Sequence, residues 1–366
     1  MTPPRPTLAV LVAPNGLGHF RRVVAVLAEL VTSFTPVPEL HLFAETWARD
    51  RMAGWAALDA LEAAAPTWVP GVMAPGVTWS TRVEDYRDGR LLAWIERLRE
   101  HDVITTAELV VSDNLGGTLA VRPDAVLMGS FLWSDVLADA HAGDRAVDEF
   151  VALERTLLAT HRPPMVCVGD MALPGVLART DAVEVGWMVD AAEPADPSAT
   201  RVAVLGGRTG AADVLLVDAA RALVERGVDV TVDPALADAV PSVVAFPFGD
   251  AAWADLGAVV CRPGMGTLTE CVARRLPLVT LCEAGNSELA HNGAAIARLG
   301  LGADAGVEPD PASVAQLTVE LLADRGGTIR RRMSSLNTHG IAQAATFLAD
   351  RLDLHRTDPR HQGPHA

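Results

Sequence analysis

The chain has 366 residues and a net charge of -16, and all thirty of its basic residues are arginines. Half of the residues are hydrophobic, so the chain can bury sizeable cores and is long enough for two domains. The acidic charge argues against a nucleic-acid binder, which needs a basic face, and the missing lysine excludes Schiff-base and P-loop lysine chemistry.

Four cysteines are scattered along the chain without a C-x-x-C pair, so no disulfide framework is expected. The apolar run over residues 8–13 is too short for the core of a signal peptide. No apolar run reaches the roughly 18–20 residues that a membrane span needs. We therefore expect a cytoplasmic protein without a transmembrane segment, while contact with a membrane surface stays open.

The N-terminal half alternates short apolar runs with helical patterns. Residues 7–13 have the continuous apolar pattern of a buried parallel strand. A turn over 15–18 is followed by an amphipathic helix over 21–31 and a second strand over 40–44. Three more strands of this half are predicted over 109–112, 125–128 and 165–168.

The turn after the first strand reads Gly16-Leu17-Gly18-His19-Phe20-Arg21-Arg22. As a dinucleotide-binding fingerprint it is weak, because Arg21 stands where a third glycine is needed. Glu45, which ends the second strand, keeps that alternative open. A lone histidine at a helix start is more often an ordinary turn residue, so spacing alone assigns His19 no function.

A polar, proline-containing linker over residues 190–198 is the clearest break in the chain. A new alternation follows it, with a strand over 202–205, a glycine-rich turn over 206–210 and a helix over 212–226. Further strands are predicted over 228–232, 243–245 and 258–261. The pattern indicates two doubly wound, Rossmann-like α/β domains, with a ligand cleft between them.

The domain boundaries follow from this alternation. The N-terminal domain is expected over residues 1–189 and the C-terminal domain over 199–340. A last helix is predicted over 341–352. One arrangement open to this helix is to pack back onto the N-terminal domain. The polar tail over 353–366 is expected to be disordered.

Two strand-to-helix turns within residues 257–302 are candidate anion sites, because helix N-termini expose unpaired N–H groups and a positive dipole end. The first has glycines at 264 and 266, with a helix expected from Thr267 and Glu270 in its first turn. The second has Asn286 and Glu288, with a helix expected near Asn292. Thr267-x-x-Glu270 also fits a capping box, and Asn286 an ordinary helix cap.

In combination, these motifs resemble the donor-binding segment of the two-domain GT-B glycosyltransferases. The nearest group includes the bacterial N-acetylglucosaminyltransferase of peptidoglycan synthesis and the nucleotide-sugar hydrolases of flagellin modification. The resemblance implies that the C-terminal domain binds a nucleoside-diphosphate sugar, with a UDP-sugar preferred, as substrate and without a further cofactor. Asn286-Ser287-Glu288 departs from the Asp-Gln or Gln-Gln of many relatives, which leaves the donor sugar open.

The resemblance also implies where the donor is held. Its diphosphate is expected beside the glycine-rich turn over 206–210 and at the helix start over 264–267. Its base is expected near Phe248 and its ribose on Glu270. Its sugar is expected near Asn286 and Glu288. The donor-binding residues expected on this basis are Gly16, Gly18, Gly206, Gly207, Arg208, Gly210, Phe248, Gly264, Gly266, Thr267, Glu270, Asn286, Glu288 and Asn292.

In the N-terminal domain, Gly-x-Gly-His-x-x-Arg resembles the first loop of the GT-B relatives, where the histidine acts as general base. The resemblance therefore implies that His19 takes a proton from the acceptor. Asp113, which ends a buried strand, is the expected carboxylate partner of His19, with capping of the following helix as its alternative. No Asp-x-Asp motif occurs, so metal-independent chemistry is expected.

These expectations describe an inverting, metal-independent glycosyltransferase of the hexosyltransferase type. It would move a sugar to a small-molecule or glycan acceptor. One alternative is a nucleotide-sugar hydrolase in which His19 activates water. A second is a non-catalytic protein that binds nucleotide sugars.

Overall fold

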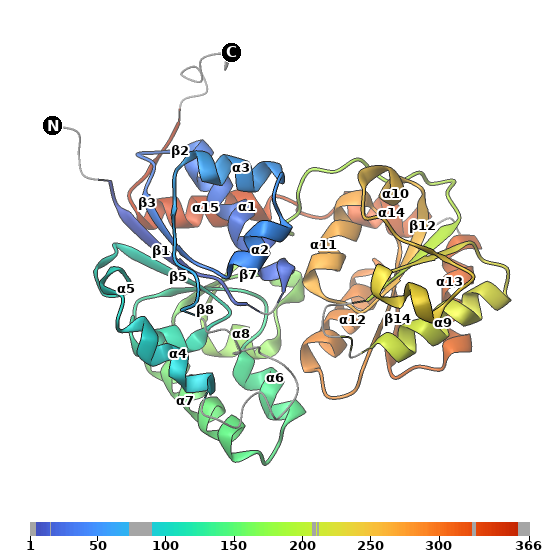
Figure 1. Ribbon diagram of the computed structural model, residues 1–366, viewed down its shortest axis with the longest axis horizontal. Coiled ribbons are helices and arrows are strands. Elements are labelled where there is room, and N and C mark those ends of the chain that lie inside the picture. Colours follow the sequence, from blue (N-terminus) through green and yellow to red (C-terminus); the bar gives the residue numbers. More distant parts are fainter. Residues whose placement is uncertain are drawn as a thin grey trace. The chain divides into compact units, whose positions relative to one another are not determined.

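The computed structural model describes residues 5–14, 16–72, 90–206, 210, 212–323 and 327–357, without the side chains of residues 90–92. It divides into two compact units: Met1–Met188 with His339–Ala366, and Val189–Thr338. Each unit contains a parallel sheet covered by helices (Figure 1). This confirms the predicted doubly wound α/β architecture.

The sheet of the first unit has seven parallel strands. In sheet order they are β4 (Thr67–Trp68), β3 (Glu39–Phe43), β1 (Thr7–Leu11), β5 (Leu109–Asp113), β6 (Val126–Met128), β7 (Pro164–Val168) and β8 (Asp181–Val185). The central strands β1 and β5 are buried and mostly apolar, as in sheets whose two faces are covered by helices, and β5 ends in the polar residues Ser112 and Asp113.

The helices of the first unit lie in two layers (Figure 1). One layer includes α1, α3 and α15, and the other includes α4, α6 and α7. The α-helices are α1 (Leu17–Ser33), α2 (Thr46–Arg51), α3 (Ala56–Ala63), α4 (Arg90–Leu98), α5 (Asp102–Thr106), α6 (Trp133–Ala140), α7 (Arg145–His161), α8 (Pro174–Arg179) and α15 (Gly340–Arg351); the 3-10 helices are η2 (Gly116–Ala120) and η3 (Gly169–Met171).

The C-terminal segment belongs to the first unit, because α15 packs against α1. Residues 353–357, predicted to be disordered, are ordered instead. β15 (His355–Arg356) pairs antiparallel with β2 (Phe34–Thr35), and the Thr357 amide donates to the Ser33 carbonyl at 2.9 Å. A polar tail carries no local sign of this distant pairing, which is why the sequence did not reveal it. Residues 358–366 lie outside the described residues.

The second unit has six parallel strands. In sheet order they are β11 (Val244–Ala245), β10 (Val230–Val232), β9 (Arg201–Leu205), β12 (Leu256–Cys261), β13 (Leu278–Cys282) and β14 (Gly302–Val307). Its helices are α9 (Asp213–Glu225), η4 (Pro234–Ala239), α10 (Asp250–Ala254), α11 (Met265–Arg274), α12 (Ser287–Leu299), α13 (Pro311–Ala323) and α14 (Gly327–Ser334).

The segment over 190–198, predicted as a linker, lies in the second unit and packs onto it in part. The Ala195 amide donates to the Arg274 carbonyl and the Asp196 amide to the Ala254 carbonyl, both at 2.9 Å. The Ala195 side chain is buried. Backbone hydrogen bonds therefore fix the middle of this polar segment, although its composition is that of a loop.

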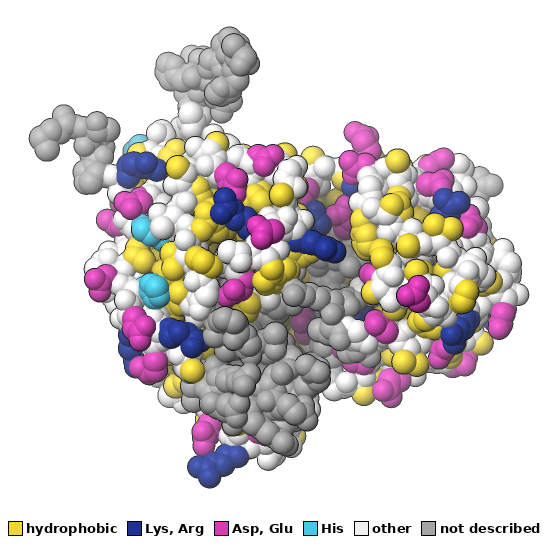
Figure 2. Space-filling model, viewed as in Figure 1, with side chains coloured by type: hydrophobic (Ala, Val, Ile, Leu, Met, Phe, Trp, Pro, Cys, Tyr) yellow, Lys and Arg dark blue, Asp and Glu magenta, His cyan; other side chains and the backbone are white. Residues whose placement is uncertain are grey.

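On the face of the molecule in Figure 2, the coloured basic side chains stand singly or in small groups among acidic and apolar ones. No helix within the described residues is long and apolar enough to cross a membrane.

Candidate active site

Three side chains of the first unit meet where β1 and β5 end. His19 and Arg22 lie near the start of α1, which follows β1 after a short turn, and Asp113 is the last residue of β5. The two strands are neighbours, with Leu11 paired to Ser112, so the end of β5 lies beside the turn that leads into α1. The sheet thus brings together residues more than ninety positions apart in the chain.

The Asp113 carboxylate accepts hydrogen bonds at both oxygens. His19 Nδ1 lies 2.7 Å from Oδ2, and Arg22 donates to Oδ1 through Nη2 and, at 3.1 Å, through Nε. Asp113 is fully buried, whereas the side chains of His19 and Arg22 are 15% and 13% exposed. Burial raises the pKa of Asp113, but the charges of Arg22 and His19 and their hydrogen bonds outweigh it and hold the pKa below its ordinary value.

This charge state of Asp113 settles which ring nitrogen of His19 carries the proton. An ionised carboxylate only accepts hydrogen bonds, so Nδ1 of His19 is the donor in their contact. Nε2 is then the unprotonated nitrogen of the neutral ring, the form that a general base requires. The alternative for Asp113 is wrong, because η2 has Leu115 at its N-cap position and Asp113 binds His19 and Arg22 instead.

Asn114 and Gly129 support this group, although neither was among the predicted site residues. Asn114 is buried with a φ of 55°, and its Oδ1 lies 3.4 Å from Arg22 Nη2. Gly129 has a φ of 148°, and a Cβ there would come within 1.2 Å of Asn114 Oδ1. Gly129 therefore makes the space that Asn114 fills. The only local signal is an Asn and a Gly placed directly after neighbouring strands.

The two predicted glycines of this loop lie at the start of α1. Gly16 is the N-cap residue, in extended backbone that other residues also adopt, and Gly18 is the second residue of the helix. Within the described residues, no side chain caps α1 and its first turn contains no acidic residue. His19 is the third residue of α1 and therefore lies at the positive end of this helix dipole.

In the second unit, the predicted donor residues follow three neighbouring strands. Gly206 follows β9, Gly264 and Gly266 follow β12, and Asn286 follows β13. Because the carboxyl ends of parallel strands lie along one edge of a sheet, these turns are neighbours.

The N-terminus of α11 is open to an anion. Its N-cap residue is Gly264, no side chain of the described residues caps it, and its first turn contains no acidic residue. Thr267 is its third residue, so the predicted start of the helix was two residues late and the capping box is wrong. Glu270 is thereby placed in the second turn, where its Oε1 accepts from Arg274 Nε at 2.8 Å.

Arg274 connects Glu270 to an aromatic group. Its guanidinium donates from Nη2 to Asp250 Oδ1 at 2.6 Å and lies 5.7 Å from the centre of the Trp253 ring. Phe246 packs edge-on against Trp253, with ring centres 4.9 Å apart. The residues expected near ribose and base are therefore parts of one packed cluster.

Phe248 forms the outer part of that cluster. Its ring lies 4.9 Å from Phe246 and 6.3 Å from Trp253, and half of the residue is exposed. Its φ of 57° is rare for a residue with a side chain. An exposed aromatic ring held by buried ones is suited to stacking on a flat ligand.

Asn286 and Asn292 both have structural partners. Asn286 caps α12 by accepting from the Leu289 amide at 3.2 Å, as the helix-cap alternative predicted, and it donates to Glu283 Oε1 at 3.3 Å. Asn292 lies inside α12 rather than at its start, and its Nδ2 donates to the Pro263 carbonyl at 2.9 Å. Asn292 thereby holds the turn in front of α11. Glu288 is the second residue of α12.

The glycine-rich turn is more acidic than expected. Gly207 and Arg208 lie outside the described residues, while Gly206 and Gly210 lie beside Asp213. Burial and the nearby charge of Asp233 raise the pKa of Asp213, and Arg262 lowers it. These carboxylates disfavour an anion at Gly206, whereas the first turn of α11 contains no acidic residue.

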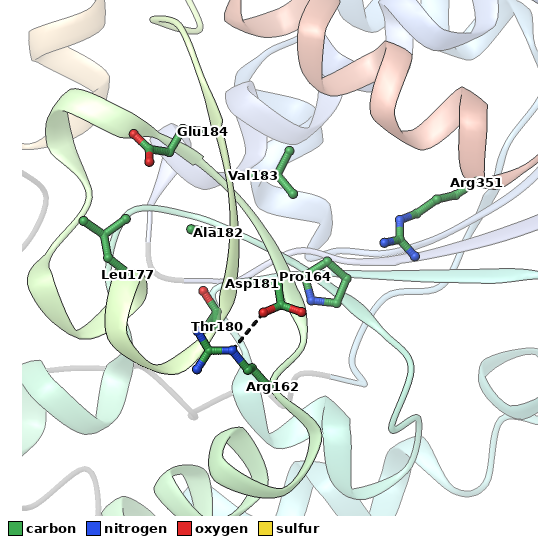
Figure 3. Close-up of a pocket in the computed structure, with 9 residues that line it drawn as sticks. All are labelled: Arg162, Pro164, Leu177, Thr180, Asp181, Ala182, Val183, Glu184 and Arg351. Carbon is green, nitrogen blue, oxygen red and sulfur yellow. Dashed lines mark hydrogen bonds and ion pairs between the residues drawn. The ribbon is translucent and has the colours of Figure 1, made fainter.

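A surface pocket of the first unit lies elsewhere (Figure 3). It contains Pro164 and Asp181, the first residues of β7 and β8, whereas Asp113 is the last residue of its strand. Arg162 Nε donates to Asp181 Oδ1 at 2.8 Å in this pocket. None of the predicted site residues that the structure describes lines it.

No family model and no curated protein matches the chain. Solved structures do. The calicheamicin glycosyltransferase CalG4 is 18% identical, with 96% of this chain and 98% of that chain covered and a TM-score of 0.58. Phytolacca americana UGT2, complexed with UDP-2fluoro-glucose and pterostilbene, is 12% identical, with 96% and 99% covered and a TM-score of 0.67. The glycosyltransferase SnogD from Streptomyces nogalater is 16% identical, with 95% and 100% covered and a TM-score of 0.56.

Proposed function

We propose that this chain, which has the GT-B fold of the glycosyltransferases that it resembles, transfers a sugar from a nucleoside-diphosphate sugar to an acceptor hydroxyl. The observation that carries the proposal is the 2.7 Å contact between His19 Nδ1 and Asp113 Oδ2 at the ends of two central strands. It supplies an oriented base in the unit expected to bind the acceptor.

The second unit binds the donor in this proposal. The open N-terminus of α11 receives the diphosphate, because its amides and dipole favour negative charge. Glu270 accepts from the ribose hydroxyls, and a flat base lies near Phe248. The positive helix end also stabilises the charge that develops on the leaving group, so the reaction proposed here requires no metal.

His19 acts on the acceptor. Its Nε2 takes the proton of the attacking hydroxyl as that oxygen bonds to the anomeric carbon. The bond from this carbon to the phosphate oxygen breaks, and its electron pair leaves with the nucleoside diphosphate. Attack from the face opposite the leaving group inverts the configuration. Asp113 holds the ring and stabilises the positive charge that it gains.

We propose a small molecule as the acceptor. The support comes from two similar structures, UGT2 complexed with pterostilbene and the rhamnosyltransferase SpnG complexed with spinosyn aglycone. A UDP-sugar remains the preferred donor, and a dTDP-sugar is its competitor, because UGT2 was solved with a UDP-sugar and SpnG with thymidine diphosphate.

The test is a matrix of UDP- and dTDP-sugars with phenolic and macrolide-like acceptors. Mass spectrometry detects the glycosylated product, and a coupled assay detects the released nucleoside diphosphate. A product that depends on the acceptor supports the proposal. Rapid stoichiometric release of free sugar without any acceptor would show a hydrolase, with water activated by His19. Nucleotide binding without turnover of any pair would show a binding protein.

A further inference from the structure

We propose that Arg22 controls the protonation of the His19–Asp113 pair, because it keeps Asp113 ionised and disfavours the cationic form of His19. Arg22 is then a positioning residue that acts through Asp113 and His19 and need not touch the substrate. The proposal rests on the proposed function only in taking His19 as the base.

The geometry places Arg22 where it acts on both partners. It follows His19 by three residues on α1, so the two side chains project from the same face of the helix. Arg22 uses two nitrogens on Asp113 Oδ1, while His19 uses Oδ2. One carboxylate therefore serves two basic groups, and neither oxygen is shared.

The first consequence is orientation. A guanidinium that donates two N–H groups to one side of a carboxylate restricts the rotation of that carboxylate. Oδ2 is thereby held toward Nδ1 of His19, which fixes the neutral ring with its proton on Nδ1. A lysine at position 22 would keep a positive charge but would lose the pair of N–H groups with which the guanidinium holds the carboxylate.

The second consequence concerns charge. With Arg22 charged and Asp113 ionised, the group of three is neutral when His19 is neutral. A proton on His19 adds a second cation against a single carboxylate, and Arg22 Nη2 lies only 3.3 Å from His19 Nδ1. Since Asp113 is fully buried, these charges interact more strongly than they would in water.

Two neighbours of this group add no charge. Phe131, after β6, packs edge-on against His19 with ring centres 6.3 Å apart. Asn114, after β5, is neutral and contacts Arg22. Asp113 and Arg22 are therefore the charged side chains, among the described residues, whose contacts with His19 the structure shows, and His19 lies at the start of α1, whose dipole adds positive potential.

A direct test is an NMR titration of the His19 side chain without substrate. It compares the wild type with Arg22→Met and with Arg22→Gln, which also lacks the charge but keeps polar groups. Loss of Arg22 should move the titration midpoint of His19 upward, because it removes the cation that lies 3.3 Å from the ring. Arg22→Lys should stay near the wild-type midpoint, because it keeps the charge.

The matched control is Arg21→Met. Arg21 is the preceding residue of α1, and its guanidinium lies 5.6 Å from the Trp55 ring. This variant should leave the midpoint unchanged. Circular dichroism melts show which variants are folded. If only one of Arg22→Met and Arg22→Gln is folded, the midpoint of His19 in that variant is sufficient for the test. An unchanged or lowered midpoint in Arg22→Met or Arg22→Gln would overturn the proposal.

Kinetics separate this proposal from the proposed function. In the charge-neutral variants, the acid limb of kcat/KM should move upward with the NMR midpoint, whereas a purely structural role would lower activity at every pH alike. If His19→Ala keeps full turnover while the midpoint still moves in Arg22→Met, the base assignment fails and the effect of Arg22 stands. If turnover is lost in His19→Ala and the midpoint does not move, the effect of Arg22 fails alone.

Discussion

The carboxylate of Glu154 on α7 accepts a hydrogen bond of 2.5 Å from the backbone N–H of Ser134, in the first turn of α6. Both residues are buried in the first unit. A Cβ at Gly116 in η2 would lie only 2.7 Å from Glu154 Oε1. Glu154 therefore packs between the segment that follows Asp113 and the segment that follows β6, so it supports the surroundings of His19 without contacting it.

Glu154 predicts a specific dependence of stability on pH. The pKa of Glu154 is raised from 4.5 to about 7, and burial is the largest cause. The charge of Asp135 also raises the pKa, whereas the hydrogen bonds from Ser134 and the charge of Arg179 lower it. Because the folded-state pKa is above the unfolded value, the native state binds more protons between these pH values. The group therefore costs stability progressively as pH rises from about 4.5 to above 7, by ~3 kcal/mol in total.

Glu154→Gln should remove this dependence, because glutamine does not ionise but still offers an oxygen to the Ser134 amide. Relative to the wild type, the variant should gain stability as pH rises from 5 to 8. Urea unfolding at both values measures this difference. Glu149→Gln, an exposed change on the same helix, serves as control. Parallel pH curves for the wild type and Glu154→Gln would contradict the assignment.

Gly129→Ala tests the space beside Asn114. A Cβ at this position would overlap Asn114 Oδ1, and the backbone φ of 148° also disfavours a side chain. The matched variant is Gly143→Ala, whose φ of 86° is also positive but where a Cβ meets nothing within 4 Å. Gly129→Ala should lose about 1–3 kcal/mol more stability than the control, the usual range for overpacking. Equal losses in thermal unfolding would show that only backbone strain matters.

The sheets were predictable because their strands are short, continuous and apolar. The apolar residues of β1 and β12 reveal burial without any knowledge of their partners. Helix starts were less accurate. Thr267 suggested a cap, but α11 begins at Met265, with Gly264 as its N-cap residue and Gly266 inside its first turn. Local propensity places a helix, while its first residue depends on the turn that precedes it.

The sequence predicted those site residues whose side chains have a characteristic chemical role, such as a histidine that can act as a base. Asp113 ends the central strand β5 and His19 comes shortly after its neighbour β1, so the order of strands in the sheet brings the two residues together. Arg22 was part of the recognised pattern, but its contact with Asp113 depends on that same long-range pairing. The contact of Arg274 with Glu270 is local, yet its extension to Asp250 and Trp253 requires the fold.

His19→Ala tests the general base. Loss of the imidazole should lower kcat by about 10²–10⁴, the usual contribution of general-base catalysis, and leave donor affinity nearly unchanged. Steady-state kinetics and calorimetric binding of the nucleoside diphosphate measure the two effects. His41→Ala is the control, since His41 lies on β3 and pairs with Glu39. Wild-type turnover in His19→Ala would refute the base assignment.

Glu270→Gln tests the ribose contact in the second unit. The change keeps the shape of the side chain but removes the charge that, in the proposed function, accepts hydrogen bonds from two neighbouring ribose hydroxyls. Affinity for the nucleoside diphosphate should fall by ~1–3 kcal/mol, the range for a hydrogen bond to a charged group. Isothermal titration calorimetry measures this loss, and a deoxyribose analogue should lose less affinity on the same change.

The control for Glu270 comes from its partner Arg274. Asp250 accepts from the same guanidinium but is 92% exposed, so Asp250→Asn disturbs Arg274 while leaving Glu270 in place. Affinity should stay near the wild-type value in this variant. If Asp250→Asn and Glu270→Gln weaken binding equally, the effect passes through the position of Arg274, and Glu270 has no direct contact with the ribose. Unchanged affinity in both would leave Glu270 with a structural role alone.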